Sequence, residues 1–575
     1  MNLIKKIENE LENCLDKLGY SNEKVVLNIS SRPEIGEYQY NGAMSLAKRV
    51  NIPLMELANS ICKEFSTLPF FEDVNVTNPG FINFTISKES KIAFLNQLIE
   101  SNEFVDTLPK KKIFIDYGGP NVAKILHVGH LRSANIGESL KRLAKLLGHE
   151  VICDVHLGDY GLQMGMILLE IKSRFPNLKC FDVNFKGEME NIPIDCNDLI
   201  ELYPIASKKA KENEQYMNEA RMITYELQSG HSGYNALWKK IVEISISDIK
   251  RIYKRLNVSF DLWEGESDAA KYYNELNDYL EKNNYIEDSL GAKVIRFDDN
   301  IPPLLLVKSN KALSYEATDL ATIWERKKIY SPDEIWYVVD KRQSLHFKQV
   351  FLAAKKTQII DDDTKLEFIG FGTMNSSDGK PFKTRDGGVM SLDELISIVK
   401  DETSKNVKET IVNEEREDTV EKIAIGTLKF ADLLSSRTTD YIFDPIKFSE
   451  STGKTAPFVM YTTIRIESLL TKAKNKEFTF NKIYSINDDL ENQIVLNILN
   501  LQKVLENSFN NRSLNEITDF LYQIDNSFNN LYSNSHFLNE KDSCQRETWL
   551  SLSYIVKEIN IMLLNVLAIS LPPRM

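Results

Sequence analysis

One stretch constrains the fold more than any other: two short apolar runs enclose a helical pattern between Lys112 and Val155. The first run, KIFID at 112–116, predicts a strand, and VICDV at 151–155 predicts a second one. Between them, apolar residues recur at helical spacing over about 130–147, and Gly148 supplies a stop signal. A strand, a helix and a strand in this order predict one βαβ unit of a parallel sheet.

The tetrapeptide His127-Val128-Gly129-His130 lies where the first strand gives way to the helix. The free N–H groups and the positive dipole end of a helix make an anion site at such a point. Two imidazoles three residues apart would lie over that site, and Gly129 would let a flat ring approach the backbone. The segment therefore suggests a nucleotide triphosphate site, although four residues alone are equally compatible with local hydrogen bonding.

The remaining chain predicts a multidomain α/β protein, because 575 residues exceed what one hydrophobic core normally serves. Strands at 334–340 and 366–371, with helices before and between them, extend the βαβ unit into a doubly wound, Rossmann-like parallel sheet. We expect four parts: a small α+β domain (1–105), the Rossmann-like domain with a mostly helical insertion at about 165–310 (106–390), a helical connector (391–450) and an all-α terminal domain (451–575).

Composition excludes several classes of protein. The net charge of −13 argues against a general nucleic-acid coat, but it leaves room for a local basic face that contacts RNA. Six scattered cysteines without a CxxC pair argue against a zinc site or a disulfide framework. The first twenty residues do not have the pattern of a secretory or transit peptide, and no apolar run approaches membrane-spanning length. We expect a cytoplasmic protein, and a monomer, since no long exposed heptad pattern is present.

A second group of residues follows the strand at 366–371. Lys380, Lys383 and Arg385 lie in the segment NSSDGKPFKTRDGG, where several glycines predict a mobile loop. A cationic loop at the carboxyl edge of a sheet can close on a polyphosphate and stabilise the charge of departing pyrophosphate. Alone, the segment is more simply a solvated basic turn; together with HVGH in a split α/β fold, it favours a functional role.

HVGH followed at a distance by KPFKTR resembles the two signature motifs of class I aminoacyl-tRNA synthetases. The surrounding sequence is similar to the arginyl-tRNA synthetases in particular, over nearly the whole chain. The blocks that carry this resemblance, in chain order, are GEYQYNGAMSLAK, NPGFINF, DYGGPNVAKILHVGHLRSANIG, HLGDYGLQMG, FDLWEGES, YVVDKRQSLHFKQVF, DGKPFKTRDGG, TAPFVMYTTIRI and the terminal LPPRM. The first domain resembles the family's tRNA-contacting domain, and the terminal helices resemble its anticodon-binding domain.

A guanidinium group requires planar carboxylate partners, and two acids are well placed for this role. Asp116 ends the first strand, while Asp319 lies four residues after Tyr315 on one helical face. The resemblance assigns arginine binding to Asp116, Asn121, Tyr315, Asp319 and Gln343, with Asn121 and Gln343 near the α-amino and α-carboxylate groups. Without it, Asp319 would be a surface acid, and core packing would explain Tyr315 equally well.

The resemblance also implies the ATP side of the site, formed by His127, Gly129, His130, His346, Lys380, Lys383 and Arg385. The family's loop motif is Lys-Met-Ser-Lys-Ser, and two registers of KPFKTR against it are open. If Phe382 stands for the methionine, Thr384 replaces the second lysine and a cation is missing; otherwise Lys380 and Lys383 are the two lysines. We hypothesise that Lys124, just before HVGH, binds an ATP phosphate and supplies the missing cation.

The implied chemistry is arginine–tRNA ligation. The carboxylate of L-arginine attacks the α-phosphorus of ATP, with Mg²⁺ screening the phosphates and no protein ligand to the metal, and tRNA(Arg) then accepts the arginyl group. The resemblance further implies that tRNA must bind before arginine is activated. Three alternatives remain: another class I synthetase, a catalytically inactive tRNA-binding paralogue, and a small-molecule nucleotidyltransferase. The scattered cysteines disfavour another class I synthetase that binds zinc. The intact motifs disfavour an inactive paralogue, and the long helical terminus disfavours a small-molecule nucleotidyltransferase.

Overall fold

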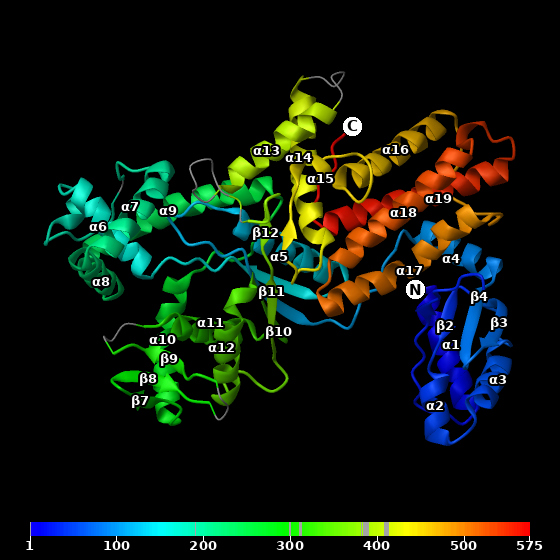
Figure 1. Cartoon of the computed structure of the whole chain (residues 1–575), viewed down its shortest axis with the longest axis horizontal. Helices are drawn as coiled ribbons and strands as arrows, with labels where there is room; N and C mark the ends of the chain where they lie inside the picture. The colour runs from blue at the N-terminus through cyan, green and yellow to red at the C-terminus, as the bar shows by residue number, and fades with distance from the viewer. Residues whose placement is uncertain are drawn as a thin grey trace.

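The computed structural model describes residues 2–189, 191–297, 301–309, 313–380, 382, 390–407 and 413–575. At its centre is a four-stranded parallel sheet in the order β11-β10-β5-β6 (Figure 1). Its strands are β5 (Lys112–Tyr117), β6 (Glu150–Asp154), β10 (Glu334–Asp340) and β11 (Lys365–Phe371). The sheet confirms the predicted doubly wound arrangement, with β5 paired to both β6 and β10.

Helix α5 (Val128–Leu146) connects β5 to β6 and is buried along most of its length. It begins two residues before the predicted start, because His127 itself caps the helix and so brings Val128 and Gly129 into the first turn. On the second half of the sheet, α11 (Tyr315–Tyr330) precedes β10, and η2 (Lys341–Gln343) with α12 (Ser344–Lys356) connects β10 to β11. The carboxyl ends of the strands and the amino ends of α5 and α12 therefore meet at one edge.

The insertion is mostly helical, as predicted, but it also contains a small antiparallel sheet that the sequence did not reveal. This sheet has the order β7-β8-β9 and lies beside α10 to α12 (Figure 1). The elements of the insertion are α6 (Leu162–Arg174), η1 (Lys179–Phe181), α7 (Cys196–Glu212), α8 (Glu214–Gln228), α9 (Ser232–Arg255), α10 (Glu266–Lys282), β7 (Glu287–Ser289), β8 (Ala292–Ile295) and β9 (Leu304–Val307).

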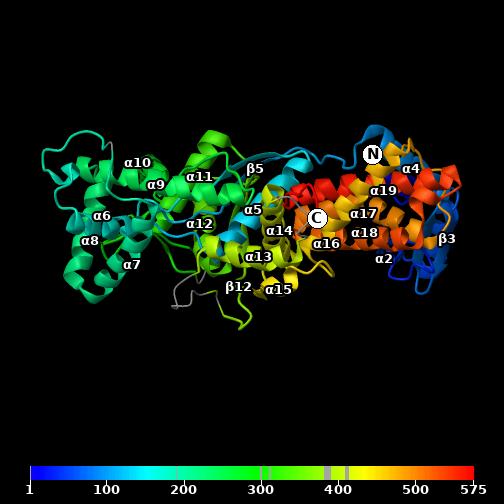
Figure 2. The same cartoon turned by 90° about the horizontal axis from the view of Figure 1, so that it is seen from above.

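The N-terminal α+β unit lies at the far end of the elongated molecule from α6 to α8 (Figure 2). It has a four-stranded sheet in the order β1-β2-β4-β3. Hydrogen bonds join it to α17: Lys91 donates to Asn492 at 2.9 Å, and the Tyr38 hydroxyl donates to Asn500 at 3.0 Å. The elements are α1 (Leu3–Lys17), β1 (Asn28–Ile29), β2 (Tyr38–Tyr40), α2 (Ala43–Val50), α3 (Leu54–Phe65), β3 (Phe71–Thr77), β4 (Phe81–Ile86) and α4 (Lys88–Ser101).

Beyond residue 390 the described part of the chain is helical, as predicted, apart from the short strand β13 (Tyr441–Ile442), which pairs with β12 (Met374–Asn375). The last four long helices form a bundle beside the central sheet (Figure 1). The helices of this region are α13 (Leu392–Asn406), α14 (Asn413–Leu434), α15 (Pro445–Phe448), α16 (Ala456–Asn475), α17 (Asp489–Asn511), α18 (Asn515–Asn534), η3 (Phe537–Asn539) and α19 (Ser543–Val566). Among the residues that the structure describes, no helix has the length and apolar character needed to cross a membrane.

Candidate active site

A cavity of about 540 Å³ opens at the carboxyl edge of the central sheet. It lies between β5, β10 and the amino ends of α5 and α11, at the place where doubly wound sheets bind their ligands. Nine residues that the sequence singled out line this one cavity: Asp116, Asn121, His127, Gly129, His130, Tyr315, Asp319, Gln343 and His346. Segments more than two hundred residues apart in the chain therefore form a single site.

The two histidines of HVGH cap α5 reciprocally. Nδ1 of His127 accepts from the Gly129 amide at 3.0 Å, and Nδ1 of His130 accepts from the His127 amide at 3.1 Å. A neutral imidazole that accepts at Nδ1 carries its proton on Nε2, so each ring keeps one N–H donor for a ligand. Gly129 leaves room for the capping ring, because a Cβ at this position would lie 2.9 Å from the His127 ring.

Both rings are neutral at physiological pH. Burial, reinforced by the charges of Lys124 and Arg342, lowers the pKa of His127. Burial, with the charges of His127 and Lys124, lowers the pKa of His130 to about 3. Neutral Nε2–H groups are suited to donating hydrogen bonds to phosphate oxygens, whereas neither ring is poised to exchange protons near pH 7.

The acid at the end of β5 is already engaged by a buried arginine. Nη2 of Arg326, on α11, donates to Asp116 at 2.7 Å and to Asp154 at 3.1 Å, and the Arg326 side chain is only 1% exposed. Burial raises the pKa of Asp116, and Arg326 opposes this only in part. Asp116 therefore lines the cavity as expected, but its carboxylate is already paired with Arg326. The sequence analysis did not single out Arg326.

Asp154 also contacts His156, whose Nδ1 lies 3.4 Å from the carboxylate. Burial alone would raise the pKa of Asp154, but His156 and Arg326 outweigh it and lower it to about 2. Burial would lower the pKa of His156, yet the contacts with Asp154 and Asp116 raise it to about 9. Two carboxylates thus face two cations beneath the cavity floor, and His156 itself lines the cavity.

Asp319 and Tyr315 lie on the cavity side of α11, as their spacing predicted. Oδ2 of Asp319 lies 2.5 Å from Nε2 of His346, at the start of α12. Burial would lower the pKa of His346, but Asp319 and the charge of Glu316 raise it above its ordinary value. His346 was predicted on the ATP side of the site, whereas the structure places it against the acid predicted to bind arginine. Tyr315 is 56% exposed, so core packing does not account for it.

Glu266 is a lining residue that the sequence analysis missed. It is the first residue of α10, at the end of the FDLWEGES block, and it faces the same cavity as Asp319. Burial, with the charges of Asp159 and Asp319, raises the pKa of Glu266 to about 7. The FDLWEGES block was recognised as a family feature, and its second glutamate was the available signal.

A second cavity of about 650 Å³ adjoins the first and shares Glu266, Tyr315 and Thr318 with it. Its wall is mainly apolar and aromatic, and it includes Tyr160 and Tyr225. Two cations, Arg221 and Lys308, also line it, and neither forms an ion pair with a carboxylate in the described part of the chain. Aromatic rings beside cations suit a nucleotide with its phosphates.

The predicted cations are less well placed. Lys124 does not line the cavity; its Nζ lies 4.4 Å from the centre of the Tyr203 ring, although its charge acts on both HVGH histidines. Lys380 is exposed, outside the cavity lining, in a turn where its amide donates to Asp378 at 3.0 Å. Lys383 and Arg385 lie outside the described residues. Arg342 lines the cavity, paired with Asp340 at 2.7 Å, and the sequence analysis did not select it.

Among the described residues, one group has metal-binding geometry: Asp116, Asp154 and His156, whose ligand atoms lie within 4.8 Å of one another. The Arg326 guanidinium already donates to both carboxylates of this group. A magnesium ion prefers oxygen ligands, and here it would lie against a buried cation and an imidazole. This group does not fit Mg²⁺.

Three family models together match most of the chain. They are "tRNA synthetases class I (R), catalytic domain" over residues 94–445, "Arginyl tRNA synthetase N terminal domain" over 1–86 and "DALR anticodon binding domain" over 459–575. Arginine–tRNA ligase of Alkaliphilus oremlandii is 41% identical over the full length of both chains. This chain belongs to the arginyl-tRNA synthetase family. The arginine–tRNA ligase of Francisella tularensis subsp. novicida is 39% identical, also over both full lengths.

Solved structures of the family share the fold. Arginyl-tRNA synthetase of Plasmodium falciparum superposes with a TM-score of 0.83 at 23% identity, covering 100% of this chain and 99% of that one. The Thermus thermophilus arginyl-tRNA synthetase gives a TM-score of 0.78 at 18% identity, with both chains fully covered. The sheet, the N-terminal unit and the helical end are thus arranged as in other arginyl-tRNA synthetases.

Proposed function

We propose that this chain is an arginine–tRNA ligase that activates L-arginine with ATP in the cavity at the edge of the sheet and transfers it to tRNA(Arg). The observation that carries the proposal is the polarity of that cavity. The amino end of α5 contributes two neutral Nε2–H donors, His127 and His130, and α10 and α11 contribute the acids Glu266 and Asp319. A ligand that carries both a phosphate and a guanidinium matches these two sets of groups, and arginyl-adenylate, in which one phosphate joins adenosine to the arginyl group, is such a ligand.

On the ATP side, His127 and His130 donate to phosphate oxygens, and the amino end of α5 adds its dipole. As charge grows on the α-phosphate and on the departing pyrophosphate, these donors stabilise it without moving a proton. Lys124 supplies further positive charge from just outside the cavity, with Lys380, Lys383 and Arg385 as cations of the loop. ATP enters as its Mg²⁺ complex, with the ion carried on the phosphates.

On the arginine side, Asp319 and Glu266 bind the guanidinium, and Tyr315 covers it from the cavity mouth. His346 acts as a positioning residue, because its hydrogen bond holds the Asp319 carboxylate in one orientation. Asn121 and Gln343 take the α-amino and α-carboxylate groups. Asp116, neutralised in part by Arg326, contributes to the field around the α-amino group rather than binding the guanidinium directly.

The adjoining aromatic cavity receives the terminal adenosine of tRNA, since the acceptor hydroxyl must reach the arginyl carbonyl. Glu266, Tyr315 and Thr318 belong to both cavities, so an adenosine in one contacts the walls of the other. Because the two cavities share these residues, an adenosine bound in one can position the residues that bind arginine in the other. This supports activation of arginine that depends on bound tRNA. The ligase acts as a monomer in the cytoplasm, where its three substrates are available.

ATP–pyrophosphate exchange with each of the twenty amino acids, with and without tRNA(Arg), tests the proposal. We expect exchange with arginine alone, and only when tRNA is present. Exchange with lysine or glutamate, or none with any amino acid, would contradict the assignment. Exchange with arginine in the absence of tRNA would retain the ligase and remove the tRNA dependence.

A further inference from the structure

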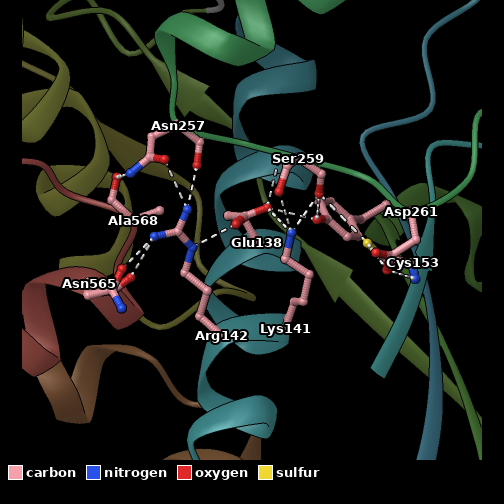
Figure 3. Close-up of polar contacts among 10 residues, drawn as sticks. Glu138, Lys141, Arg142, Cys153, Asn257, Ser259, Asp261, Asn565 and Ala568 are labelled. Atoms are coloured by element: carbon pink, nitrogen blue, oxygen red, sulfur yellow. Dashed lines mark hydrogen bonds and ion pairs between the residues drawn. The ribbon is translucent and has the colours of Figure 1, made fainter. Parts of the chain in front are cut away.

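Arg142, in the second half of α5, joins three parts of the molecule through one guanidinium (Figure 3). Its Nε donates to Oε1 of Glu138 at 2.7 Å, on the same helix. Nη2 donates to the carbonyl and the side-chain oxygen of Asn257 at 2.9 and 3.0 Å. Nη1 donates to the carbonyl and the side-chain oxygen of Asn565 at 3.0 and 2.8 Å. These contacts, the Arg142 junction, use the full donor set of the group.

The first branch of the junction leads to the cavity. The other oxygen of Glu138, Oε2, accepts from the Tyr117 hydroxyl at 2.9 Å. Tyr117 ends β5, directly after Asp116, and lines the cavity. The contact between this strand and α5 is tight, because a Cβ on Gly137 would lie 2.2 Å from the Tyr117 ring. Oε2 also pairs with Lys141 at 2.7 Å and accepts from the Ser259 amide at 3.1 Å, so Glu138 connects Arg142 to the cavity floor as part of a small buried network (Figure 3).

The second branch leads through the insertion. Asn257 follows α9, and two residues of that helix hold the loop after β5. The Tyr253 hydroxyl donates to the Gly118 carbonyl, and Oγ of Ser245 accepts from the Ala123 amide at 3.0 Å. This loop carries Asn121. The position of α9 therefore determines the position of the loop after β5, including Asn121.

The third branch leads into the anticodon-binding domain. Asn565 lies near the end of α19, the last helix of that domain, and α19 packs on α5. Asn257 reinforces the contact by donating to the Ala568 carbonyl at 3.3 Å. α19 also packs in the helical bundle with α16 and α18, and Asn560, five residues before Asn565, donates to Thr463 of α16 and Asp525 of α18. A shift of the bundle on binding tRNA would act directly on Arg142.

We propose that Arg142 is a positioning residue that couples the seating of the anticodon-binding domain to the geometry of the catalytic cavity. The proposal rests on the ligase activity argued above and goes beyond it. Coupling between distant sites requires a contact that both sites bias, and the junction is shared by α19, α9 and α5. Lysine keeps the charge of arginine but cannot reproduce its planar, five-donor geometry, so Arg142→Lys uncouples the branches without burying an unpaired acid.

Arg512, near the amino ends of the sheet strands, provides a matched control. Arg512, after α17, also joins the terminal domain to the sheet, and it donates to Glu334 at 3.2 Å and Glu367 at 2.8 Å. These acids lie near the amino ends of β10 and β11, away from the cavity. Arg512→Lys disturbs a contact between the same two parts of the protein without touching the junction.

The experiment measures kcat and KM for aminoacylation of two tRNA(Arg) transcripts, one native and one with its three anticodon bases replaced. In the unmodified enzyme we expect the replacement to lower kcat by about tenfold or more. In Arg142→Lys, kcat for native tRNA falls toward that for the altered tRNA and their ratio approaches one, while KM for native tRNA stays within about twofold. Asn565→Ala, which removes an exposed partner of Arg142, shifts the ratio in the same direction. Arg512→Lys keeps the ratio of the unmodified enzyme.

Comparing two tRNAs on one enzyme preparation cancels any loss of folded protein. An unchanged kcat ratio in Arg142→Lys, an equal change in Arg512→Lys, or an effect confined to KM would overturn the proposal. An anticodon effect in the unmodified enzyme that appears only in KM would overturn it as well. Failure of the unmodified enzyme to charge native tRNA with arginine would instead refute the ligase function.

Discussion

Arginine binding should release a proton from Glu266, and the structure sets the size of this effect. Burial holds the pKa of Glu266 at about 7, so about half of these carboxyl groups are protonated at pH 7 in the free enzyme. A bound guanidinium favours the ionised carboxylate and lowers its pKa. Glu266 should therefore release about half a proton per arginine bound at pH 7. Since the ionised fraction rises from about 0.1 at pH 6 to about 0.9 at pH 8, affinity for arginine should rise by about tenfold across this range.

Calorimetric titration of the enzyme–tRNA complex with arginine, in buffers of different ionisation enthalpy and without ATP, measures the proton release directly. Glu266→Gln should remove about half a proton at pH 7 and weaken binding by about thirtyfold or more, because a charge-assisted contact is lost. Glu325 is a matched control, since its pKa is also about 7 and it does not line the cavity. Equal proton release in Glu266→Gln and the unmodified enzyme, or an equal loss in Glu325→Gln, would refute the reasoning.

Four further predictions follow from the same geometry. Lys124→Ala should lower arginine-dependent exchange by at least about tenfold. Lys250 lies over the Trp263 ring outside the cavity, so the control Lys250→Ala should not lower exchange. Near-normal exchange in Lys124→Ala would exclude a phosphate contact. His130→Ala should reduce kcat for exchange by about 10²–10³, and a loss confined to KM for arginine would place the ring on the wrong side of the site. Asp319→Asn should raise KM for arginine by about a hundredfold and lower the pKa of His346, followed by NMR titration; an unchanged His346 titration would contradict the contact. Arg326→Met removes one of the two cations that face the buried acids Asp116 and Asp154 and should lower the free energy of unfolding in urea by about 3–5 kcal/mol; a loss below about 1 kcal/mol would be inconsistent with the buried network.

Periodicity predicted the central sheet and its helices because these elements are buried and their patterns are regular. Strands such as β10 are almost continuously apolar, as parallel strands covered on both faces must be. The small sheet β7-β8-β9 was missed because its strands have only three or four residues, too few to show a period of two, and because β7 is polar. The start of α5 was placed late because histidine is an unusual capping residue, and its role depends on Nδ1 geometry.

The site was predictable where one segment carries several functional groups and unpredictable where partners come from distant segments. HVGH brings two histidines and a helix start together, and the spacing of Tyr315 and Asp319 places both on one side of α11. Arg326 lies on the same helix but pairs with acids from β5 and β6, and no local pattern indicates that. Glu266 and Arg142 likewise acquire their surroundings only through folding.

A structure of the protein with a non-hydrolysable arginyl-adenylate analogue and tRNA would show directly which residues bind each part of the ligand. We expect the guanidinium between Asp319 and Glu266, and the group replacing the phosphate within hydrogen-bond distance of Nε2 of His127 and His130. An analogue bound in the opposite orientation, or outside the cavity between β5 and α11, would contradict the proposed function.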